Sequence, residues 1–298
     1  MNSKKVIAVA YGEVLWDVFE NKKMIGGAPL NVALRMKTLG CEVAMISCVG
    51  DDEDGAAILK YVKNLGLETT GIMQSEDFPT GLVNVVLNDK GSATYEIKYP
   101  AAWDKIVLND FANTLVDHAD VLIYGSLVCR DEVSRYSLEK LLQKKLYKVF
   151  DVNLRKPHYS YEIIQKLMLS ADFIKFNDDE LLEISTFLKS PFSSLEENMY
   201  FMAENTAAKA ICVTRGSHGA LLLWKGQLYE NQGYKVKVAD TVGAGDSFLA
   251  ALITSLLTGK DPQKSIDFAC AMGALVAQSH GANPLISISE IEKLNQTS

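Results

Sequence analysis

Paired cysteines and long apolar runs are both missing from this chain of 298 residues. Its five cysteines are odd in number, lie far apart and form no CxxC pair, so the sequence encodes neither a disulfide framework nor a zinc knuckle. The first apolar run, residues 6–10, is too short for a signal sequence or a membrane span. We therefore expect a cytoplasmic protein without a membrane partner.

Positive charge and several common catalytic motifs are also scarce. Lys and Arg total 30 against 37 Asp and Glu, a net charge of −7, and no basic block is present to neutralise a nucleic-acid backbone. We expect no nucleic-acid partner. The patterns GxxxxGK[ST], HExxH and GxSxG do not occur, and no GxGxxG follows the first apolar run. A P-loop, a dinucleotide fold, a metalloprotease and an α/β-hydrolase therefore lack motif support.

The chain does contain short runs rich in Val and Ile that alternate with longer helical patterns. This alternation predicts an α/β fold, a three-layer sandwich with a mostly parallel central sheet. No repeat or linker interrupts the chain, so we expect a single domain over residues 1–298. The expected strands are 6–10, 43–49, 121–124, 149–152, 173–176 and 210–214, and the longest helices are 244–258 and 262–278.

Two extended stretches, residues 12–25 and 80–103, break the alternation. The second stretch is typical of a hairpin with its turn at Asp89, Lys90 and Gly91. We expect the two stretches to pair into a small β lid beside the main domain. Ordinary surface hairpins are the alternative interpretation.

The segment DTVGAGDSF, residues 240–248, is the most informative for chemistry. Gly243, Ala244 and Gly245 stand just before a long helical pattern, so their unobstructed amides can face an anion at the positive helix end. Asp246 falls in the first turn, where a carboxylate stays ionised and can accept a proton. The alternative is a helix cap after a tight turn.

A second segment, GGAPLNVA at residues 26–33, leads into a helix expected over 32–39. Its paired glycines, Gly26 and Gly27, permit close approach of the backbone to a ligand, and the Asn31 amide suits a hydroxyl. Asp17 offers a carboxylate that can bridge two vicinal hydroxyls. A solvated loop acid is the alternative interpretation of Asp17.

With these segments in order, the chain resembles the ribokinase-like, or phosphofructokinase-B, carbohydrate kinases over essentially its whole length. The resemblance is carried by GG…N, GDDEDG (50–55), DVNLR (151–155), NDDE (177–180), TRGSHG (214–219) and DTVGAGDSF. The combination of GEVLWD, GGAPLNVA and DVNLR looks most like the fructokinase branch.

The resemblance implies roles for the reacting groups. Asp246 matches the general base, residues Gly243, Ala244 and Gly245 match the anion hole for the transferred phosphoryl group, and Arg155 contacts the substrate or that group. A salt bridge between Arg155 and Asp151 or another acid is the structural alternative. The positions that match sugar contacts are Asp17, Gly26, Gly27 and Asn31.

It also implies the cofactors ATP and Mg²⁺, and in many relatives a monovalent cation such as K⁺. Asn177 and Glu180 match the element that organises magnesium and phosphate, with Glu180 acting through water. Asp240, together with the 279–284 loop, matches the place of the monovalent cation. The loop for the nucleotide phosphates corresponds to Thr214, Gly216 and Gly219.

The expected function is an ATP-dependent sugar kinase that phosphorylates the primary hydroxyl of a ketose, D-fructose to fructose 6-phosphate. Ala28 and Pro29 depart from the ribokinase pattern, which weakens ribose as the substrate. The alternatives are 2-keto-3-deoxygluconate kinase, ribokinase or a nucleoside kinase; a non-catalytic sensor is disfavoured because Asp246 is intact. Tyr95, Tyr99 and Trp103 either stack on a ligand ring or pack within the lid. Edges of a lid sheet offer one route to a homodimer.

Overall fold

The computed structural model describes residues 5–87 and 93–296. The expected turn at Asp89, Lys90 and Gly91 lies outside these residues. Within them, no helix is long and apolar enough to cross a lipid bilayer.

A nine-stranded sheet forms the centre of the molecule, in the order β13-β12-β11-β10-β9-β8-β1-β4-β5. Neighbouring strands from β11 to β5 run parallel, whereas β12 and β13 form an antiparallel edge. All six predicted strands are present, and the α/β prediction is confirmed. The strands are β1 (Ile7–Tyr11), β4 (Glu42–Gly50), β5 (Ile72–Ser75), β8 (Val121–Gly125), β9 (Tyr147–Asp151), β10 (Phe173–Asn177), β11 (Ala210–Thr214), β12 (Ala220–Trp224) and β13 (Gln227–Asn231).

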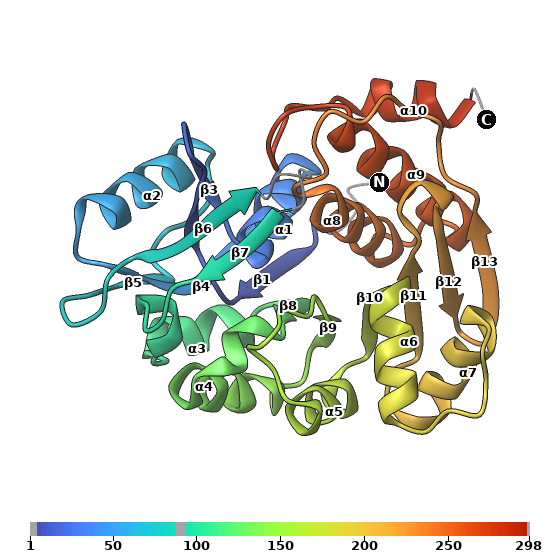
Figure 1. The fold of residues 1–298 in the computed structure, drawn as a ribbon, viewed down its shortest axis with the longest axis horizontal. Helices are drawn as coiled ribbons and strands as arrows, with labels where there is room; N and C mark the ends of the chain where they lie inside the picture. Colours follow the sequence, from blue (N-terminus) through green and yellow to red (C-terminus); the bar gives the residue numbers. More distant parts are fainter. Residues whose placement is uncertain (1–4, 88–92, 297–298) are drawn as a thin grey trace.

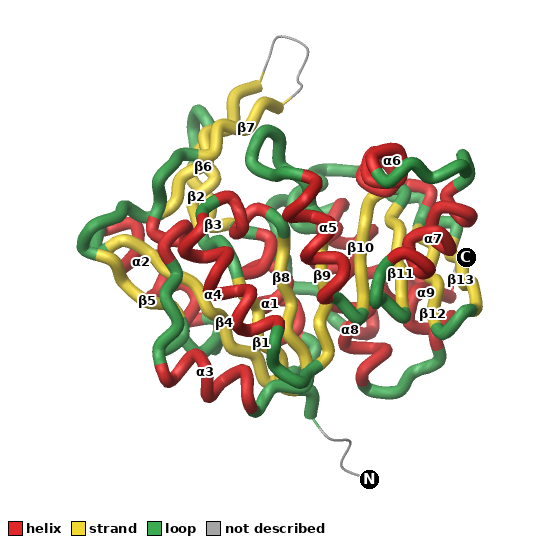
Figure 2. The backbone as a smooth tube through the Cα atoms, turned by 90° about the horizontal axis from the view of Figure 1, so that it is seen from below, coloured by secondary structure: helices red, strands yellow, loops and turns green. Residues whose placement is uncertain are grey.

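Helices cover both faces of this sheet, so the three-layer prediction is confirmed (Figures 1 and 2). One apolar cluster joins the sheet to α1, α2, α8, α9 and α10, and a second joins it to α3 through α7. Between Ser247 and Leu256 every side chain of α8 is buried, because α8 packs against α1 and α9 and shares an apolar cluster with the sheet. The helices are α1 (Ala28–Thr38), α2 (Glu53–Asn64), α3 (Asp110–Asp117), α4 (Glu132–Leu142), α5 (Tyr161–Ser170), α6 (Asp178–Phe187), α7 (Leu195–Asn205), α8 (Ala244–Leu257), α9 (Pro262–Ala277) and α10 (Ile288–Gln296).

One helix begins earlier than the sequence pattern indicates. The pattern predicts a helix over 32–39, but α1 starts at Ala28. Pro29 occupies its first turn, where a missing backbone N–H breaks no helical hydrogen bond. The early start brings the amino end of α1 close to the GG pair.

A separate four-stranded sheet has the order β3-β2-β6-β7, formed by β2 (Leu15–Val18), β3 (Lys23–Gly26), β6 (Gly81–Leu87) and β7 (Ala93–Ile97). The two extended stretches therefore pair as predicted, through parallel alignment of β2 with β6. Residues 102–105, however, form a short 3-10 helix, η1 (Ala102–Lys105), which the extended pattern did not predict. Since this small sheet projects from the main domain, it stands where a lid is expected (Figure 2).

The aromatic residues of this region have different environments. Trp103 is fully buried and lies under the Arg130 guanidinium, 4.0 Å from the ring centre, so it packs within the protein. Tyr99 is 60% exposed, and its hydroxyl donates to Asp131. The side chain of Tyr95 lies outside the described part of the chain. Packing is thus the correct interpretation for Trp103.

The GDDEDG segment joins the main sheet to the small one. Asp52 caps α2 by accepting from the Gly55 amide at 2.7 Å, and it also accepts from the amide and hydroxyl of Thr80. Gly50 donates to the same hydroxyl. Because Thr80 directly precedes β6, this network fixes the base of the small sheet.

Candidate active site

The GAG turn lies at the amino end of α8, beside the carboxyl ends of β9 and β10. Gly243 has a φ of 75°, and a side chain there would lie 2.6 Å from Ala282, so glycine is required. At Gly245 the space is open, and the nearest atom to an added Cβ is the Lys175 ammonium nitrogen at 3.6 Å. Ala244 begins the helix, and its amide donates to the Thr241 carbonyl at 3.2 Å, so the prediction that it is free to face an anion is wrong for this residue. The turn therefore presents its backbone toward a space bordered by a cation.

Asp246 is held by a chain of amides. The Asn31 side chain donates to Asp246 Oδ2 at 2.8 Å, and Asn283 donates to Asn31 Oδ1 at 2.9 Å. Burial and the nearby Asp151 raise the pKa of Asp246 to about 6, while the Asn31 hydrogen bond, Lys175 and Arg155 oppose the rise. A carboxylate that is ionised at neutral pH and titrates just below it suits a general base. Both ends of the Asn31 amide are engaged, which the sequence interpretation of Asn31 as a sugar contact did not anticipate.

Asp17 reaches the same region from β2. Burial raises the pKa of Asp17 to about 6, with Arg155 lowering it and Asp246 raising it. A side chain at Gly26 would collide with the Asp17 carboxylate, and one at Gly27, where φ is 113°, would collide with the Glu13 carbonyl. The glycine pair therefore makes room for Asp17 and for the chain after β1.

Arg155 and Asp151 separate in the structure. Asp151 forms a buried salt bridge with Lys175, Nζ to Oδ1 2.9 Å, and the two residues are register partners on β9 and β10. Arg155 is exposed, donates to the Leu154 carbonyl and acts electrostatically on Glu13, Asp17 and Asp246. The alternative of an Arg155–Asp151 bridge is therefore wrong. The sequence interpretation missed Lys175, although a lysine within the apolar run FIKF is a visible signal.

The NxxE and TxGxxG segments meet because Asn177 and Thr214 are register partners at the carboxyl ends of β10 and β11. Asn177 and Glu180 form a reciprocal capping box at the start of α6, and Glu180 also accepts from the Leu154 amide at 2.9 Å. Burial raises the pKa of Glu180, and Lys175 opposes this. Gly216 is open to solvent.

Gly219 has a φ of 78°, and a side chain there would collide with the Asn231 carbonyl.

Asp240 links the loop before α8 to the 279–284 loop. It accepts from the Val242 amide at 3.0 Å and from the Gly281 amide at 3.1 Å. The two segments that the resemblance assigns to a monovalent cation are therefore in contact.

Glu13 is a second residue that the sequence interpretation missed. It follows β1, is 3% exposed, and its Oε2 is buried without a hydrogen-bond partner. Burial raises its pKa to about 7, with Arg155 lowering and Asp246 raising it. Its place in GEVLWD is visible in the sequence, but its burial is not.

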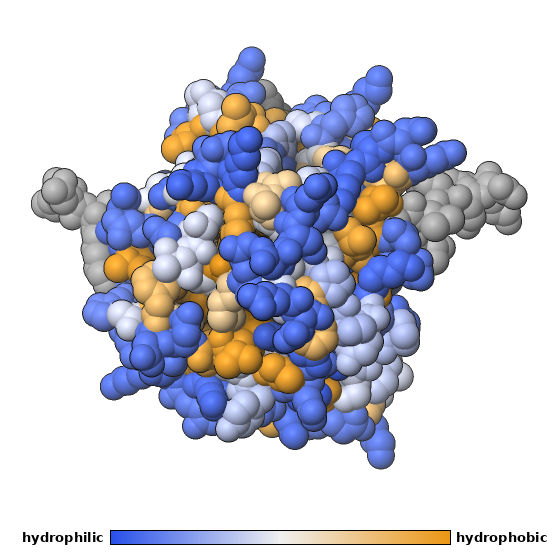
Figure 3. All heavy atoms as spheres, turned by 90° about the vertical axis from the view of Figure 1, so that its left-hand side faces the viewer, coloured by the Kyte–Doolittle hydropathy of each residue, from blue (hydrophilic) through white to orange (hydrophobic). Residues whose placement is uncertain are grey.

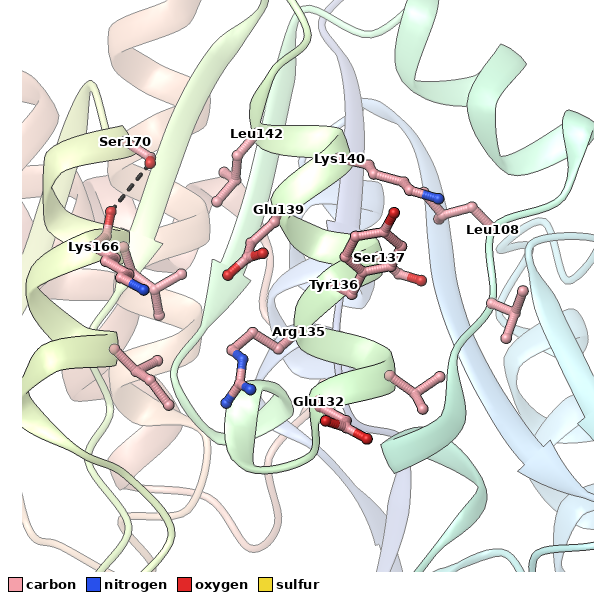
Figure 4. A pocket seen from close by; sticks show the side chains of 14 residues that line it. Leu108, Glu132, Arg135, Tyr136, Ser137, Glu139, Lys140, Leu142, Lys166 and Ser170 are labelled. Atoms are coloured by element: carbon pink, nitrogen blue, oxygen red, sulfur yellow. Dashed lines mark hydrogen bonds between the residues drawn. The ribbon is translucent and has the colours of Figure 1, made fainter.

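One hollow, of about 730 Å³, lies elsewhere and is lined by residues of α4, of α5 and of the segment before α3 (Figure 4). Arg135 and Glu139 point from α4 toward α5, which carries Lys166, whereas Lys140 points toward Leu108. These helices cover the face of the sheet opposite α8. This hollow is therefore distinct from the region around Asp246.

A carboxylate beside a glycine turn at a helix amino end can accept a proton while backbone amides face an anion, as the transfer of a phosphoryl group to an alcohol requires. The family match specifies the class. Residues 2–288 match the model of the pfkB family of carbohydrate kinases, and the chain belongs to this family. The resemblance drawn from the sequence motifs is thus confirmed.

Individual relatives agree with this assignment. An uncharacterized sugar kinase of Pyrococcus horikoshii is 30% identical over 289 residues, covering 93% of this chain and 88% of that protein. Its structure with ATP has a TM-score of 0.83 at 26% identity, covering 96% and 99%. An Escherichia coli fructokinase is 29% identical over 272 residues, covering 86% and 87%. A double mutant of Vibrio cholerae fructokinase, solved with fructose, ADP and potassium ion, has a TM-score of 0.85 at 22% identity, covering 99% of each chain.

Proposed function

We propose that this sugar kinase transfers the γ-phosphoryl group of ATP to the primary hydroxyl of a ketose, D-fructose, giving fructose 6-phosphate. The observation that carries the proposal is Asp246, fixed by Asn31 in the first turn of α8 beside the open backbone of Gly245. The base and the anion-binding amides then lie one residue apart. The fructokinases among the relatives support fructose as the sugar.

In this mechanism Asp246 takes the proton of the sugar hydroxyl as that oxygen attacks phosphorus and the bond to ADP breaks. The amides of Gly243 and Gly245 and the α8 amino end stabilise the negative charge of the transferred group. Asp17 grips sugar hydroxyls from the small sheet, and Arg155 attracts the phosphoryl group or a substrate oxygen. Closure of the small sheet as a lid excludes water and limits hydrolysis of ATP.

The residues around Glu180 fit a magnesium ion. Asp151, Glu180 and Asp246 interact electrostatically with one buried cation, Lys175, so negative charge is in excess. Both Glu180 oxygens already accept backbone amides, which suits contact with the ion through water. Bound magnesium would spread charge between the phosphates. Asn177, Thr214, Gly216 and Gly219 would hold the nucleotide phosphates, and Asp240 with the 279–284 loop would hold K⁺.

A coupled ADP-release assay tests this function across fructose, ribose, 2-keto-3-deoxygluconate, tagatose and adenosine at fixed MgATP. We expect kcat/KM for fructose to exceed that for ribose at least about tenfold, which corresponds to about 1.4 kcal/mol. Ala28 and Pro29 offer no side-chain donor to a ribose hydroxyl. Equal or higher activity on 2-keto-3-deoxygluconate, whose carboxylate Arg155 can bind, would overturn fructose as the substrate.

We further propose a cytoplasmic homodimer formed through the small sheet. β3 and β7 are its outer strands among the described residues, and outer strands can pair between subunits. On the side of the molecule that carries this sheet, hydrophobic side chains are interspersed with hydrophilic ones (Figure 3). Sedimentation velocity over a range of protein concentrations tests the proposal, and a monomer throughout would contradict it.

A further inference from the structure

Lys175 occupies a position on β10 where the strand otherwise buries apolar side chains. Phe173, two residues earlier on the same face, belongs to the apolar cluster under α8, as does Val149 on β9. Lys175 is only 7% exposed. An ammonium group therefore replaces an apolar side chain next to the amino end of α8.

The electrostatics of this position are unusual. The amino end of a helix carries partial positive charge, so a cation beside it is unfavourable unless negative groups compensate. Asp151 supplies one at 2.9 Å. Burial alone would lower the pKa of Lys175, but attraction to Asp151, Glu180 and Asp246 raises it overall, so the ammonium keeps its charge.

Lys175 also lies close to the proposed path of the phosphoryl group. Its ammonium nitrogen is 3.6 Å from the place of a Cβ on Gly245, the residue whose backbone faces the anion. Arg155, which is exposed, acts electrostatically on Asp246, one of these acids. Two cations and the α8 amides thus surround one space.

We propose that Lys175 is a positioning residue for phosphoryl transfer: held by Asp151, its fixed charge draws the γ-phosphoryl group of ATP toward the GAG turn. This inference rests on the proposed kinase function but not on the identity of the sugar. Asp151 of the DVNLR segment then serves to anchor Lys175, which leaves Arg155 without a salt bridge to Asp151.

If the Lys175–Asp151 salt bridge had only a structural role, its removal would affect stability and not phosphoryl transfer. Replacing both members of a buried ion pair by neutral groups is often neutral or stabilising, whereas removing one member leaves an uncompensated charge. The single variant Lys175→Met and the double variant Lys175→Met with Asp151→Asn therefore separate stability from function. Two further single variants, Lys175→Arg and Asp151→Asn, keep a cation at position 175. Lys148→Met, which removes a lysine at the other end of β9, is the control.

For each variant, calorimetry gives the melting temperature and the separate affinities for ATP and ADP. The coupled ADP-release assay gives kcat. We expect the double variant to melt closer to wild type than Lys175→Met does, yet to lose kcat by about 10²-fold, as when one oxyanion donor is removed. Its preference for ATP over ADP should fall. Lys175→Arg should retain kcat within about tenfold of wild type. Asp151→Asn keeps the cation but loses its anchor, so its kcat should lie between that of wild type and that of Lys175→Met.

Wild-type kcat and an unchanged ATP preference in the double variant would overturn the inference. So would Asp151→Asn being as inactive as Lys175→Met, because Asp151 rather than the ammonium would then be the functional group. A wild-type enzyme that phosphorylates no compound of the panel contradicts the proposed function instead. The ATP-to-ADP affinity ratio still tests Lys175 in that case.

Discussion

Replacing Asn31 by leucine, which is similar in size, should move the pH at which the kinase becomes active. The 2.8 Å hydrogen bond from Asn31 stabilises the charged form of Asp246, whose pKa is about 6. A hydrogen bond to a charged group contributes roughly 1.5–3 kcal/mol. Since one pKa unit corresponds to about 1.4 kcal/mol, the pKa of Asp246 should rise by about one to two, to roughly 7–8.

The assay is the pH profile of kcat/KM for the sugar at saturating MgATP, because this profile reports groups of the free enzyme. Glu13 and Asp17 titrate in the same region, so the informative quantity is the displacement of the acidic limb between variant and wild type. The variant should lose activity at pH 7 and recover most of it near pH 9. An acidic limb at the wild-type pH would refute the reasoning; Asn113→Leu, on α3, is the control.

Two of the motifs, GDDEDG and NDDE, lie where an apolar run changes into a helix, so this part of the fold was predictable. The strand β10, for example, is a buried run that ends at Asn177, and its capping box with Glu180 is a local pattern. β12 and β13 were not predicted, since they join the parallel sheet only as an antiparallel edge. A single sequence does not indicate which edge such strands extend.

Contacts between residues that are far apart in the sequence could not be predicted from it. Asn31 and Asp246 are 215 positions apart, and their hydrogen bond depends on how α1 packs against α8. Likewise, two cations are candidates to pair with Asp151: Arg155, which is close in the sequence, and Lys175, which lies on the neighbouring strand. Only the register of β9 with β10 shows that Lys175 is the partner. The positions of candidate groups were therefore predictable, but their partners were not.

Further substitutions test the remaining groups. Asp246→Asn should lower kcat by about 10²–10⁴-fold with little change in sugar affinity; more than half of wild-type kcat would remove it from the mechanism. Gly245→Val should abolish turnover yet melt near wild type, because the site of its Cβ is open, whereas Gly243→Val should melt lower because it meets Ala282. Asp17→Ala should raise KM for the sugar more than KM for ATP, as steady-state kinetics will show; a parallel rise in both would assign it to holding the small sheet. Finally, burial raises the pKa of Glu13 from 4.5 to about 7, so ionising it in the folded protein costs free energy that the unfolded chain avoids. As the pH rises from about 4 to about 8, wild type should therefore lose about 3 kcal/mol of stability relative to Glu13→Gln. Urea unfolding of both proteins at each pH measures this difference. A difference in stability that does not change with pH would show that folding does not raise the pKa of Glu13.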